Sequence, residues 1–425
     1  KENILFNSYF QELNDTESQI INYYTSGNTN QGKYNSIVKK YNTIFDSYQK
    51  KSIGLLANEF IKANHPYIPK GYETIQDFKD LGFFKIVQPK RWGGYEMDPI
   101  VFYKITSIIG EACMPSAWVY ATVGVHNWQI SVFDEKAQDE VWGDDSSVLI
   151  SSSYAPKALA KPEGDGFVVS GEWDWSSGSD HCDWFFGGAI LDPAKGLDSF
   201  VTLLIPREDY EIIDNWHTYG LKGTGSKRIK VDNIFVPAHR IHYLKDAFAN
   251  NNPDKTNKGP LYKVPFGQIF THAVAIPALG AYRGALNTFV EGAKERVSSF
   301  GVEAKTNPIT LTLASEISTE IDQLWHNIEA NVKSMMDAAN QSKEIDINDR
   351  IRYRYQVSTV NDRCVAGALK LVKASGGSTV YLGNEITNKF LDIMMTQVHV
   401  ANISDPFAMD YGSSFLGIET ENLML

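Results

Sequence analysis

The segment Gly171-Glu172-Trp173-Asp174-Trp175-Ser176-Ser177-Gly178-Ser179-Asp180-His181-Cys182 separates two short runs that have the composition of β-strands. It holds two tryptophans and three serines. An indole offers a flat apolar face and a hydroxyl both donates and accepts hydrogen bonds, so together they can stack on a heteroaromatic ring and bond its edge. The segment indicates a cofactor cradle or an aromatic β-hairpin corner with a polar turn, and taken alone it favours the corner.

Short β-branched and aromatic runs surround this segment, each bounded by Gly, Pro or Asp. Strands at this spacing predict a compact antiparallel sandwich or barrel, which we place at residues 146–245. The expected strands are Val148–Ser152, Phe167–Ser170, Phe185–Leu191, Phe200–Ile205 and Ile229–Val236.

Helical periodicity precedes the β unit and predicts an N-terminal helical domain at residues 1–145. Residues 1–30 show the weakest period and are expected to form a loose arm. The expected helices are Tyr34–Ala63, Glu73–Leu81, Pro99–Ile109, Ser116–Phe133 and Lys136–Trp142.

Helical periodicity returns after the β unit and predicts a four-helix bundle domain at residues 246–425. Its first part, Asp246–Pro260, is polar and is expected to be a mobile loop. Apolar residues from Leu313 to Met335 step by three and four, as in a helix-bundle seam. The expected helices are Ala275–Phe300, the seam helix around Leu313–Met335, Ile351–Lys373 and Ile386–Val400.

Composition narrows the class of protein. The 425 residues are 43% apolar and 21% charged, which is typical of an ordinary soluble globular protein with two or three packed units. A net charge of −11 argues against nucleic acid or an anionic membrane as a partner. Cys113, Cys182 and Cys364 form no CxxC pair, so neither a disulfide framework nor a metal site is expected. With no signal-peptide core in residues 1–30 and no bilayer-spanning stretch, a cytoplasmic location is expected.

Common catalytic motifs are absent from the sequence, which has no Walker A loop, GxGxxG, HExxH or GxSxG. The glycine-rich segment Gly220–Lys227 could present N–H groups to an anion, but its context favours a plain turn. His126 and His399 fall in apolar helical stretches, where a lone histidine is more often a satisfied core residue than a catalytic one.

The order of helices, β unit and four-helix bundle, together with Trp175-Ser176-Ser177 and Gly220–Ser226, resembles the acyl-CoA dehydrogenase fold, an α+β fold. More closely, the chain resembles the flavin-dependent monooxygenases of that fold, in particular the oxygenase component of two-component p-hydroxyphenylacetate hydroxylase. The resemblance runs from about residue 75 to the C-terminal helices. It is carried by Phe84–Pro89 with Gly93-Gly94, His126 with Gln138–Trp142, Ser151–Pro156, Trp175–His181 and Pro206–Trp216.

The resemblance implies a reaction and a cofactor site. Reduced FMN, with FADH2 as the alternative, would react with O2 to give a C4a-hydroperoxide that hydroxylates a small phenolic substrate. A separate flavin reductase would supply the reduced flavin, and the oxygenase would be a homotetramer. Trp175 and Ser176 would belong to the flavin cradle, Ser177 would contact flavin N5, and Arg296 would meet the flavin phosphate.

The resemblance also implies substrate contacts. His126 and Ser152 would reach the phenolic hydroxyl, and His399 would face the oxygen-reactive edge of the flavin. A phenol reacts fastest as phenolate, so a histidine that titrates near neutrality and is helped by a hydroxyl suits the phenolic proton.

Three other functions are alternatives to hydroxylation. An acyl-CoA dehydrogenase needs a carboxylate base, and neither of the family's two base positions, near His399 and near Phe270, carries an acid. That reaction is disfavoured. N-oxygenation of an amine or amino sugar stays open, as does a flavin-free relative that acts as a binding or assembly protein.

Overall fold

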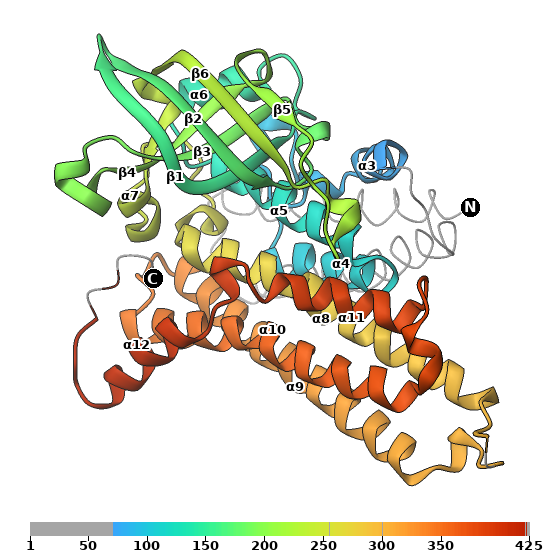
Figure 1. Ribbon diagram of the computed structural model, residues 1–425. Coiled ribbons are helices and arrows are strands. Elements are labelled where there is room, and N and C mark those ends of the chain that lie inside the picture. The colour runs from blue at the N-terminus through green and yellow to red at the C-terminus, as the bar shows by residue number, and fades with distance from the viewer. Residues whose placement is uncertain (1–70, 255, 300, 421, 423–425) are drawn as a thin grey trace, which may run out of the picture. The chain divides into compact units, whose positions relative to one another are not determined.

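Helices, a β-sheet and then helices again follow one another along the described part of the chain, residues 71–254, 256–299, 301–420 and 422 of a computed structural model (Figure 1). These residues belong to the unit Tyr67–Leu425. The expected helix Tyr34–Ala63 and the expected arm at residues 1–30 lie outside the described residues.

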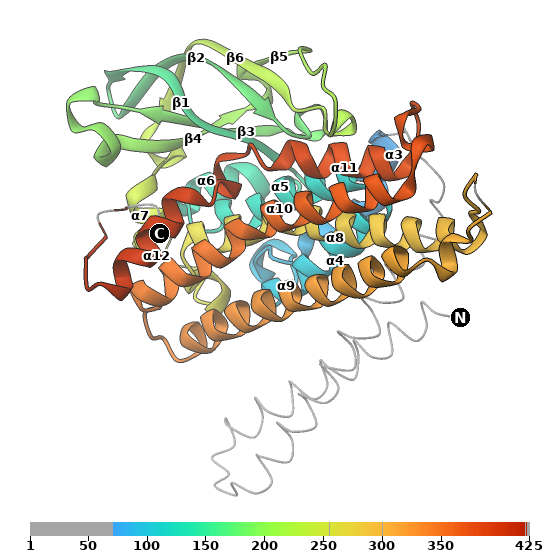
Figure 2. The same cartoon turned by 60° about the horizontal axis from the view of Figure 1, so that its bottom comes forward.

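From residue 71 onward, four α-helices precede the sheet, close to where the sequence predicts them. Asp98 and Asp134 cap two of them by accepting hydrogen bonds from Ile100 N and Lys136 N. α5 is buried on nearly every side, because it contacts β1 on one side and α8 on the other (Figure 2). The helices are α3 (Gly71–Asp80), α4 (Pro99–Ala112), α5 (Met114–Ile130) and α6 (Glu135–Trp142).

The middle of the chain forms one seven-stranded sheet of order β5-β6-β2-β1-β3-β4-β7 (Figure 1). All five expected strands are present, and two strands of three residues, β5 and β7, are additional. The strands are β1 (Ile150–Glu163), β2 (Gly166–Ser176), β3 (Trp184–Ile190), β4 (Phe200–Pro206), β5 (Glu211–Ile213), β6 (Lys227–Pro237) and β7 (Ile241–Tyr243).

The expectation of a wholly antiparallel unit is wrong for one pair of strands. β1 and β3 run parallel, with Ile150 opposite Trp184 and Ser152 opposite Phe186. β2 forms a hairpin on one edge of β1, and the segment 177–183 then carries the chain to the other edge, so β3 enters in the same direction as β1. The strands belong to a single sheet with edges at β5 and β7, rather than to two stacked sheets.

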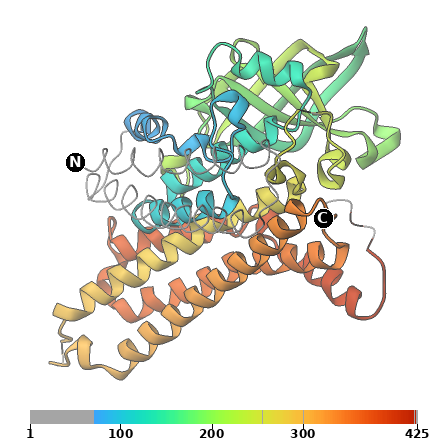
Figure 3. The ribbon, with the colours of Figure 1, turned by 180° about the vertical axis from the view of Figure 1, so that it is seen from behind.

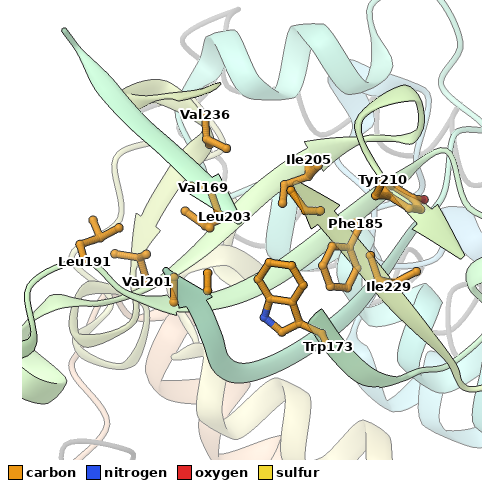
Figure 4. Packing of buried hydrophobic residues seen from close by; sticks show 13 residues of the cluster. Val169, Trp173, Phe185, Leu191, Val201, Leu203, Ile205, Tyr210, Ile229 and Val236 are labelled. Carbon is orange, nitrogen blue, oxygen red and sulfur yellow. The ribbon is translucent and has the colours of Figure 1, made fainter. Parts of the chain in front are cut away.

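One apolar core fills the concave face of this sheet, and β4 contacts β6 across it (Figure 4). Trp173 lies at its centre and donates its indole hydrogen to Gly188 O at 2.9 Å, so its only polar atom is satisfied. The members labelled in the figure are Val169, Trp173, Phe185, Leu191, Val201, Leu203, Ile205, Tyr210, Ile229 and Val236.

The predicted four-helix bundle is present, and α4 lies beside its first helix (Figure 3). Of the seam residues, those from Ile317 to Met335 are buried and Leu313 is half-buried. Two short helices, α7 (Leu244–Ala249) and α12 (Asp405–Phe415), were not expected from the sequence. The bundle helices are α8 (Phe266–Glu295), α9 (Pro308–Asn340), α10 (Ile347–Ser375) and α11 (Glu385–Thr396).

The segment expected to be a mobile loop, Asp246–Pro260, is instead fastened to the N-terminal helices. Gln138 Nε2 donates to Asp254 Oδ1 at 3.0 Å, and Asn257 Nδ2 donates to Ser131 O at 2.8 Å. Its polar side chains therefore anchor the segment.

Candidate functional site

Ser177 lies at the end of a chain of hydrogen-bonded hydroxyl groups. Trp118 Nε1 donates to Ser177 Oγ at 3.0 Å, and Ser177 Oγ lies 2.8 Å from Ser226 Oγ. Ser226 Oγ lies 2.6 Å from Thr224 Oγ1, which donates to Leu221 O at 2.9 Å. The turn at Ser177 thus joins α5 to the glycine-rich segment 220–226.

The hydrogens in this chain can be assigned one after another. Thr224 gives its hydrogen to the Leu221 carbonyl, which only accepts, so Ser226 must donate to Thr224 and Ser177 must donate to Ser226. Ser177 then receives the Trp118 hydrogen and keeps one lone pair free. The hydroxyl can therefore accept a hydrogen bond from a further N–H group but has no hydrogen left to donate.

Glycines let the surrounding backbone come close. A Cβ on Gly178 would lie 2.8 Å from Val119 Cγ1 of α5, and φ at Gly178 is +68°, so glycine suits this turn in two ways. A Cβ on Gly220 would lie 2.4 Å from Leu391 O of α11, where Leu221 N also donates to Asp392 Oδ1 at 2.6 Å. The segment 220–226, expected to be a plain turn, therefore clasps the β unit to α5 and α11.

Trp175 and Ser176 have unusual environments in the predicted flavin cradle. Trp175 has φ +69°, a region rarely adopted by large side chains, and its side chain is 64% exposed. Its conformation coincides with a register shift between β2 and β6. Ser176 is fully buried, and its hydroxyl has no hydrogen-bond partner among the described residues. The exposed indole can stack on a planar ring.

His126 is held in one tautomer on α5. Its Nδ1 lies 2.6 Å from Ile150 O, which can only accept, so Nδ1 carries the hydrogen and Nε2 carries a lone pair. Nε2 is buried without a partner in the described part of the chain. Burial lowers the pKa of His126 to about 4, so the expectation that it titrates near neutrality is wrong and the ring is neutral at pH 7.

Tyr154 links His126 to Ser152. The rings of Tyr154 and His126 lie 6.2 Å apart, and Tyr154 Oη donates to Gln129 Oε1 at 2.5 Å. A hydrogen bond from Ser152 to Tyr154 opposes the strong rise that burial produces in the pKa of the tyrosine. Ser152 and Tyr154 are two residues apart in β1 and therefore share one face of the strand.

Aromatic contacts continue from Tyr154 to His399 and back to Trp118. Phe270 lies 5.4 Å from Tyr154 and 6.3 Å from His399, and His399 lies 5.4 Å edge-on from Trp118, all between ring centroids. Burial, and secondarily the charge of Arg354, lowers the pKa of His399 to about 4. The predicted residues His126, Ser152, Ser177 and His399 are therefore connected through Tyr154, Phe270 and Trp118.

This connection also brings together the two positions at which the dehydrogenase relatives are expected to carry a base, since His399 and Phe270 are neighbours. Neither side chain is a carboxylate. The arrangement lacks the base that α-proton removal requires.

Arg296 is the one predicted cofactor residue that lies apart from the others. It ends α8 and donates to Ala374 O at 2.9 Å. Because an α-helix rises about 1.5 Å per residue, the stretch from Phe270 to Arg296 spans roughly 39 Å. Arg296 therefore lies far along α8 from Phe270, the residue through which Tyr154 and His399 are connected.

Sequence reasoning did not single out Trp118, Ser226 or Tyr154, although Trp118 and Tyr154 each carried a positional signal. Trp118 precedes His126 by two steps of four residues on α5, and Tyr154 follows Ser152 by one strand period. No such spacing points to Ser226, because its contact with Ser177 joins residues distant in sequence.

Comparison with known proteins agrees with this geometry. The family model described as "Acyl-CoA dehydrogenase, C-terminal domain" matches residues 272–403. The oxygenase subunit HsaA, a flavin-dependent monooxygenase of Rhodococcus jostii (strain RHA1), is 34% identical over 83% of this chain and 93% of its own length. The crystal structure of the 3-HSA hydroxylase from Rhodococcus sp. RHA1 superposes with a TM-score of 0.80 and 33% identity, covering 90% of this chain and 97% of that one.

Two further relatives are more distant. The oxygenase component of an FADH(2)-dependent resorcinol hydroxylase from Rhizobium sp. (strain MTP-10005) is 28% identical, covering 81% of this chain and 87% of its own. The oxygenase component of p-hydroxyphenylacetate 3-hydroxylase from Acinetobacter baumannii is 26% identical, covering 83% of this chain and 84% of its own length. The resemblance seen in the sequence is confirmed: the chain belongs to the oxygenase subunits of the flavin-dependent monooxygenases that share the acyl-CoA dehydrogenase fold.

Proposed function

We propose that this oxygenase hydroxylates a small phenolic compound, using O2 and reduced flavin that a separate reductase supplies. The observation that carries the proposal is the lone pair on His126 Nε2, buried among aromatic rings within the cluster that leads to Ser177. An acceptor in such surroundings suits the hydroxyl of an aromatic ring. The relatives named for resorcinol and p-hydroxyphenylacetate support a phenol.

The cradle around Ser177 suits a reduced flavin. A reduced isoalloxazine carries hydrogen on N5, and the free lone pair of Ser177 can accept it, while the exposed Trp175 indole can cover the ring. When bound, reduced flavin supplies the reaction with O2. The FADH2 dependence of the resorcinol relative supports FADH2 beside the reduced FMN expected from the sequence.

The role of His126 follows from its neutral state. With Nδ1–H held by Ile150 O, Nε2 can accept the phenolic hydrogen, which lets the phenolic oxygen release electron density into the aromatic ring. Ser152 and Tyr154 place further hydroxyls beside it. The surrounding aromatic rings keep water away, which favours oxygen transfer to substrate over release of H2O2.

Arg296 is proposed to meet the flavin phosphate of a neighbouring copy, because it lies at the far end of α8 from Phe270, next to exposed apolar side chains. Exposed apolar side chains surround it where α8 and α10 end and α9 and α11 begin. A surface of this kind favours a symmetric assembly, for which we propose the homotetramer. We call it the distal patch; its members are Val297, Val302, Ile309, Leu311, Val380, Tyr381 and Leu382.

An aerobic reaction with reduced FMN or FADH2 and matched phenols and amines tests the function. We expect hydroxylated phenol at the expense of H2O2. Oxygenated amine without hydroxylated phenol would make the chain an N-oxygenase. A failure to bind either reduced flavin in anaerobic titration would instead favour the flavin-free binding protein.

A further inference from the structure

Arg354 on α10 is a buried charge without a counter-ion among the described residues. Its side chain is 3% exposed, and within the described residues it forms no ion pair and its Nη1 has no hydrogen-bond partner. The guanidinium lies 3.5 Å from the ring centroid of Phe407. Burial lowers the pKa of Arg354 to about 9, and no carboxylate in the described part of the chain counteracts this effect.

The contact with Phe407 offsets only part of the cost of burying the Arg354 guanidinium. A cation–π contact recovers only part of the hydration that a guanidinium loses on burial, and charges inside proteins are normally paired with an anion. Arg354 cannot reach a neutral state near pH 7 by losing its proton. Its environment is therefore better suited to a state in which an anion is present.

A second arginine stands one turn earlier on the same face of α10. Arg350 Nη2 donates to Phe248 O at 2.6 Å, but its Nε is buried without a partner, and it too forms no ion pair inside the described ranges. Facing them on α8 are Gln268, which donates to Arg350 O at 3.1 Å, and His272, whose Nε2 has no partner in those ranges. These four residues form a polar cluster at the contact of α8 with α10.

The polar cluster borders the aromatic rings of the candidate site. Phe248, which accepts from Arg350, lies 5.8 Å from Phe266, and Phe266 lies 5.7 Å from Tyr154, both between ring centroids. The positive charge of Arg354 also contributes to the lowered pKa of His399. Arg354 therefore lies near His399, which is a neighbour of Phe270, and Arg350 is bonded to the backbone of Phe248 at the edge of the same aromatic rings.

We propose that Arg354 and Arg350 bind a carboxylate, so that the aromatic substrate of this oxygenase carries an acid group in addition to its phenol. The proposal rests on the proposed hydroxylation and narrows its substrate class. A planar guanidinium fork matches a carboxylate with two parallel hydrogen bonds. The flavin phosphate is the other anion of the reaction, and Arg296 at the far end of α8 is proposed for it.

Calorimetry on the protein without flavin tests the carboxylate site. The probes are 4-hydroxybenzoate, 4-hydroxyphenylacetate and 3-(4-hydroxyphenyl)propionate, each paired with its primary amide. We expect at least one acid to bind more tightly than its amide. Arg354→Met is expected to lower the affinity for that acid by about 10- to 100-fold and to leave the affinity for the amide unchanged. Equal affinities within all three pairs would overturn the proposal.

Thermal melting separates binding from a structural role. Because Arg354→Met removes an unpaired buried charge, the variant is expected to melt at the same temperature as the parent or higher. A lower melting temperature together with equal loss of acid and amide would show that Arg354 supports the fold only. Arg352→Met is the control, because Arg352 is half exposed on the same helix and is paired with Asp349 at 2.8 Å. Arg350→Met is the second test variant and is expected to weaken the same acid.

A flavin titration shows whether the arginines bind a substrate carboxylate or the flavin phosphate. In anaerobic titrations, Arg354→Met is expected to leave the ratio of affinities for reduced FMN and reduced riboflavin unchanged. A fall in that ratio without loss of acid binding would assign the arginines to the flavin phosphate and overturn the proposal. Because the calorimetry uses neither flavin nor O2, selective acid binding without any hydroxylation would contradict only the proposed function.

Discussion

The free lone pair of His126 has a definite origin at the scale of single residues. The Ile150 carbonyl fixes the hydrogen on Nδ1, and burial keeps the ring neutral at pH 7. The sequence predicted the residue but not its state, because hydrogen bonding and desolvation depend on a strand and rings distant along the chain. The same reasoning applies to Ser177, whose partner Ser226 is 49 residues away.

Replacing Ser177 by alanine is expected to weaken reduced-flavin binding by roughly 2- to 10-fold, as the loss of one hydrogen bond does, and to increase the share of O2 that ends as H2O2. Anaerobic titration and a peroxide assay measure the two effects. Ser179→Ala is the control, because this buried hydroxyl has no partner in the described residues. If the two variants have the same reduced-flavin affinity and form the same share of H2O2, Ser177 does not contact the flavin.

Replacing His126 by asparagine is expected to slow oxygen transfer to a phenol by about 100-fold, at the lower end of the range for acid–base assistance, since a histidine with so low a pKa is a weak base. Oxidation of bound reduced flavin by O2 should continue at nearly the parent rate, with more H2O2 formed. Rapid mixing with product analysis follows both steps.

His242→Asn is the control for that variant. His242 is equally buried and its pKa is also lowered to about 4, but it lies on β7 against Phe133. We expect it to lower stability without separating flavin oxidation from oxygen transfer. If His126→Asn impairs both steps equally, His126 has a packing role only.

Acid should destabilise the protein in a defined pH window. Burial lowers the pKa of His126, His242 and His272 from 6.5 to about 4, so the unfolded chain binds more protons than the folded chain between these values. Their contribution to stability is complete above about pH 6.5 and is lost as the pH falls to about 4. Asp392, whose pKa burial raises to about 6, acts in the opposite direction, as do Asp98 and Glu111, whose pKa burial also raises. Asp145 and Asp174, whose pKa hydrogen bonds lower, act in the same direction as the histidines. Melting temperatures should therefore fall from pH 7 to pH 4.5, and a flat profile would contradict the burial of these rings.

Segment 220–226 shows how contacts between elements position a reactive group. Gly220 approaches α11, Leu221 bonds Asp392, and Thr224 and Ser226 lead to Ser177. Its sequence resembles an ordinary turn because the partners of these residues lie on other elements. By contrast, the long helices and five of the strands were predictable, since their periodicity is local.

The elements that sequence reasoning missed share a physical cause. β5 and β7 have three residues each, too few to display an alternation, and the parallel pairing of β1 with β3 depends on the path of the chain rather than on composition. In the segment Asp246–Pro260, polarity indicated mobility, whereas its side chains bond α5 and α6.

Replacing Gly220 by alanine is expected to destabilise the protein by about 1–3 kcal/mol, because the added carbon would lie 2.4 Å from Leu391 O. Reduced-flavin affinity should fall with it, since the hydroxyl chain begins one residue later. Denaturant melts and flavin titration measure these changes.

Gly292→Ala on α8 is the matched control for this substitution. Its added carbon meets no atom within 4 Å, so the variant should gain about 0.5–1 kcal/mol from helix propensity. A Gly220→Ala protein as stable as the parent, with full flavin affinity, would show that the clasp does not position Ser177.

At the scale of the whole molecule, assembly depends on which apolar residues remain exposed. The seam from Ile317 to Met335 is buried within the chain and gives no reason for assembly, whereas the distal patch does. None of the described helices is long and apolar enough to cross a membrane.

We expect a tetramer by light scattering. The double variant Val380→Asp, Leu382→Asp should dissociate it. The variant should also weaken the binding of reduced FMN more than that of reduced riboflavin, because Arg296 would leave the neighbouring site. Leu159→Asp, at an exposed position of β1, is the control. A parent protein that is monomeric at working concentration would contradict both the assembly and the shared phosphate site.

The orientation of the hydroxyl hydrogens of Ser177, Ser226 and Thr224 affects the transfer of flavin between the reductase and the oxygenase. Ser177 offers only an electron pair, which suits a ring nitrogen that carries hydrogen. After oxidation that nitrogen presents its own electron pair, and the contact becomes repulsive. If Ser177 makes the proposed contact, the oxygenase binds the reduced flavin that arrives from the reductase and releases it after oxidation, without a conformational change. The direction of the shuttle would then be set by Thr224 and Ser226, neither of which needs to touch the flavin.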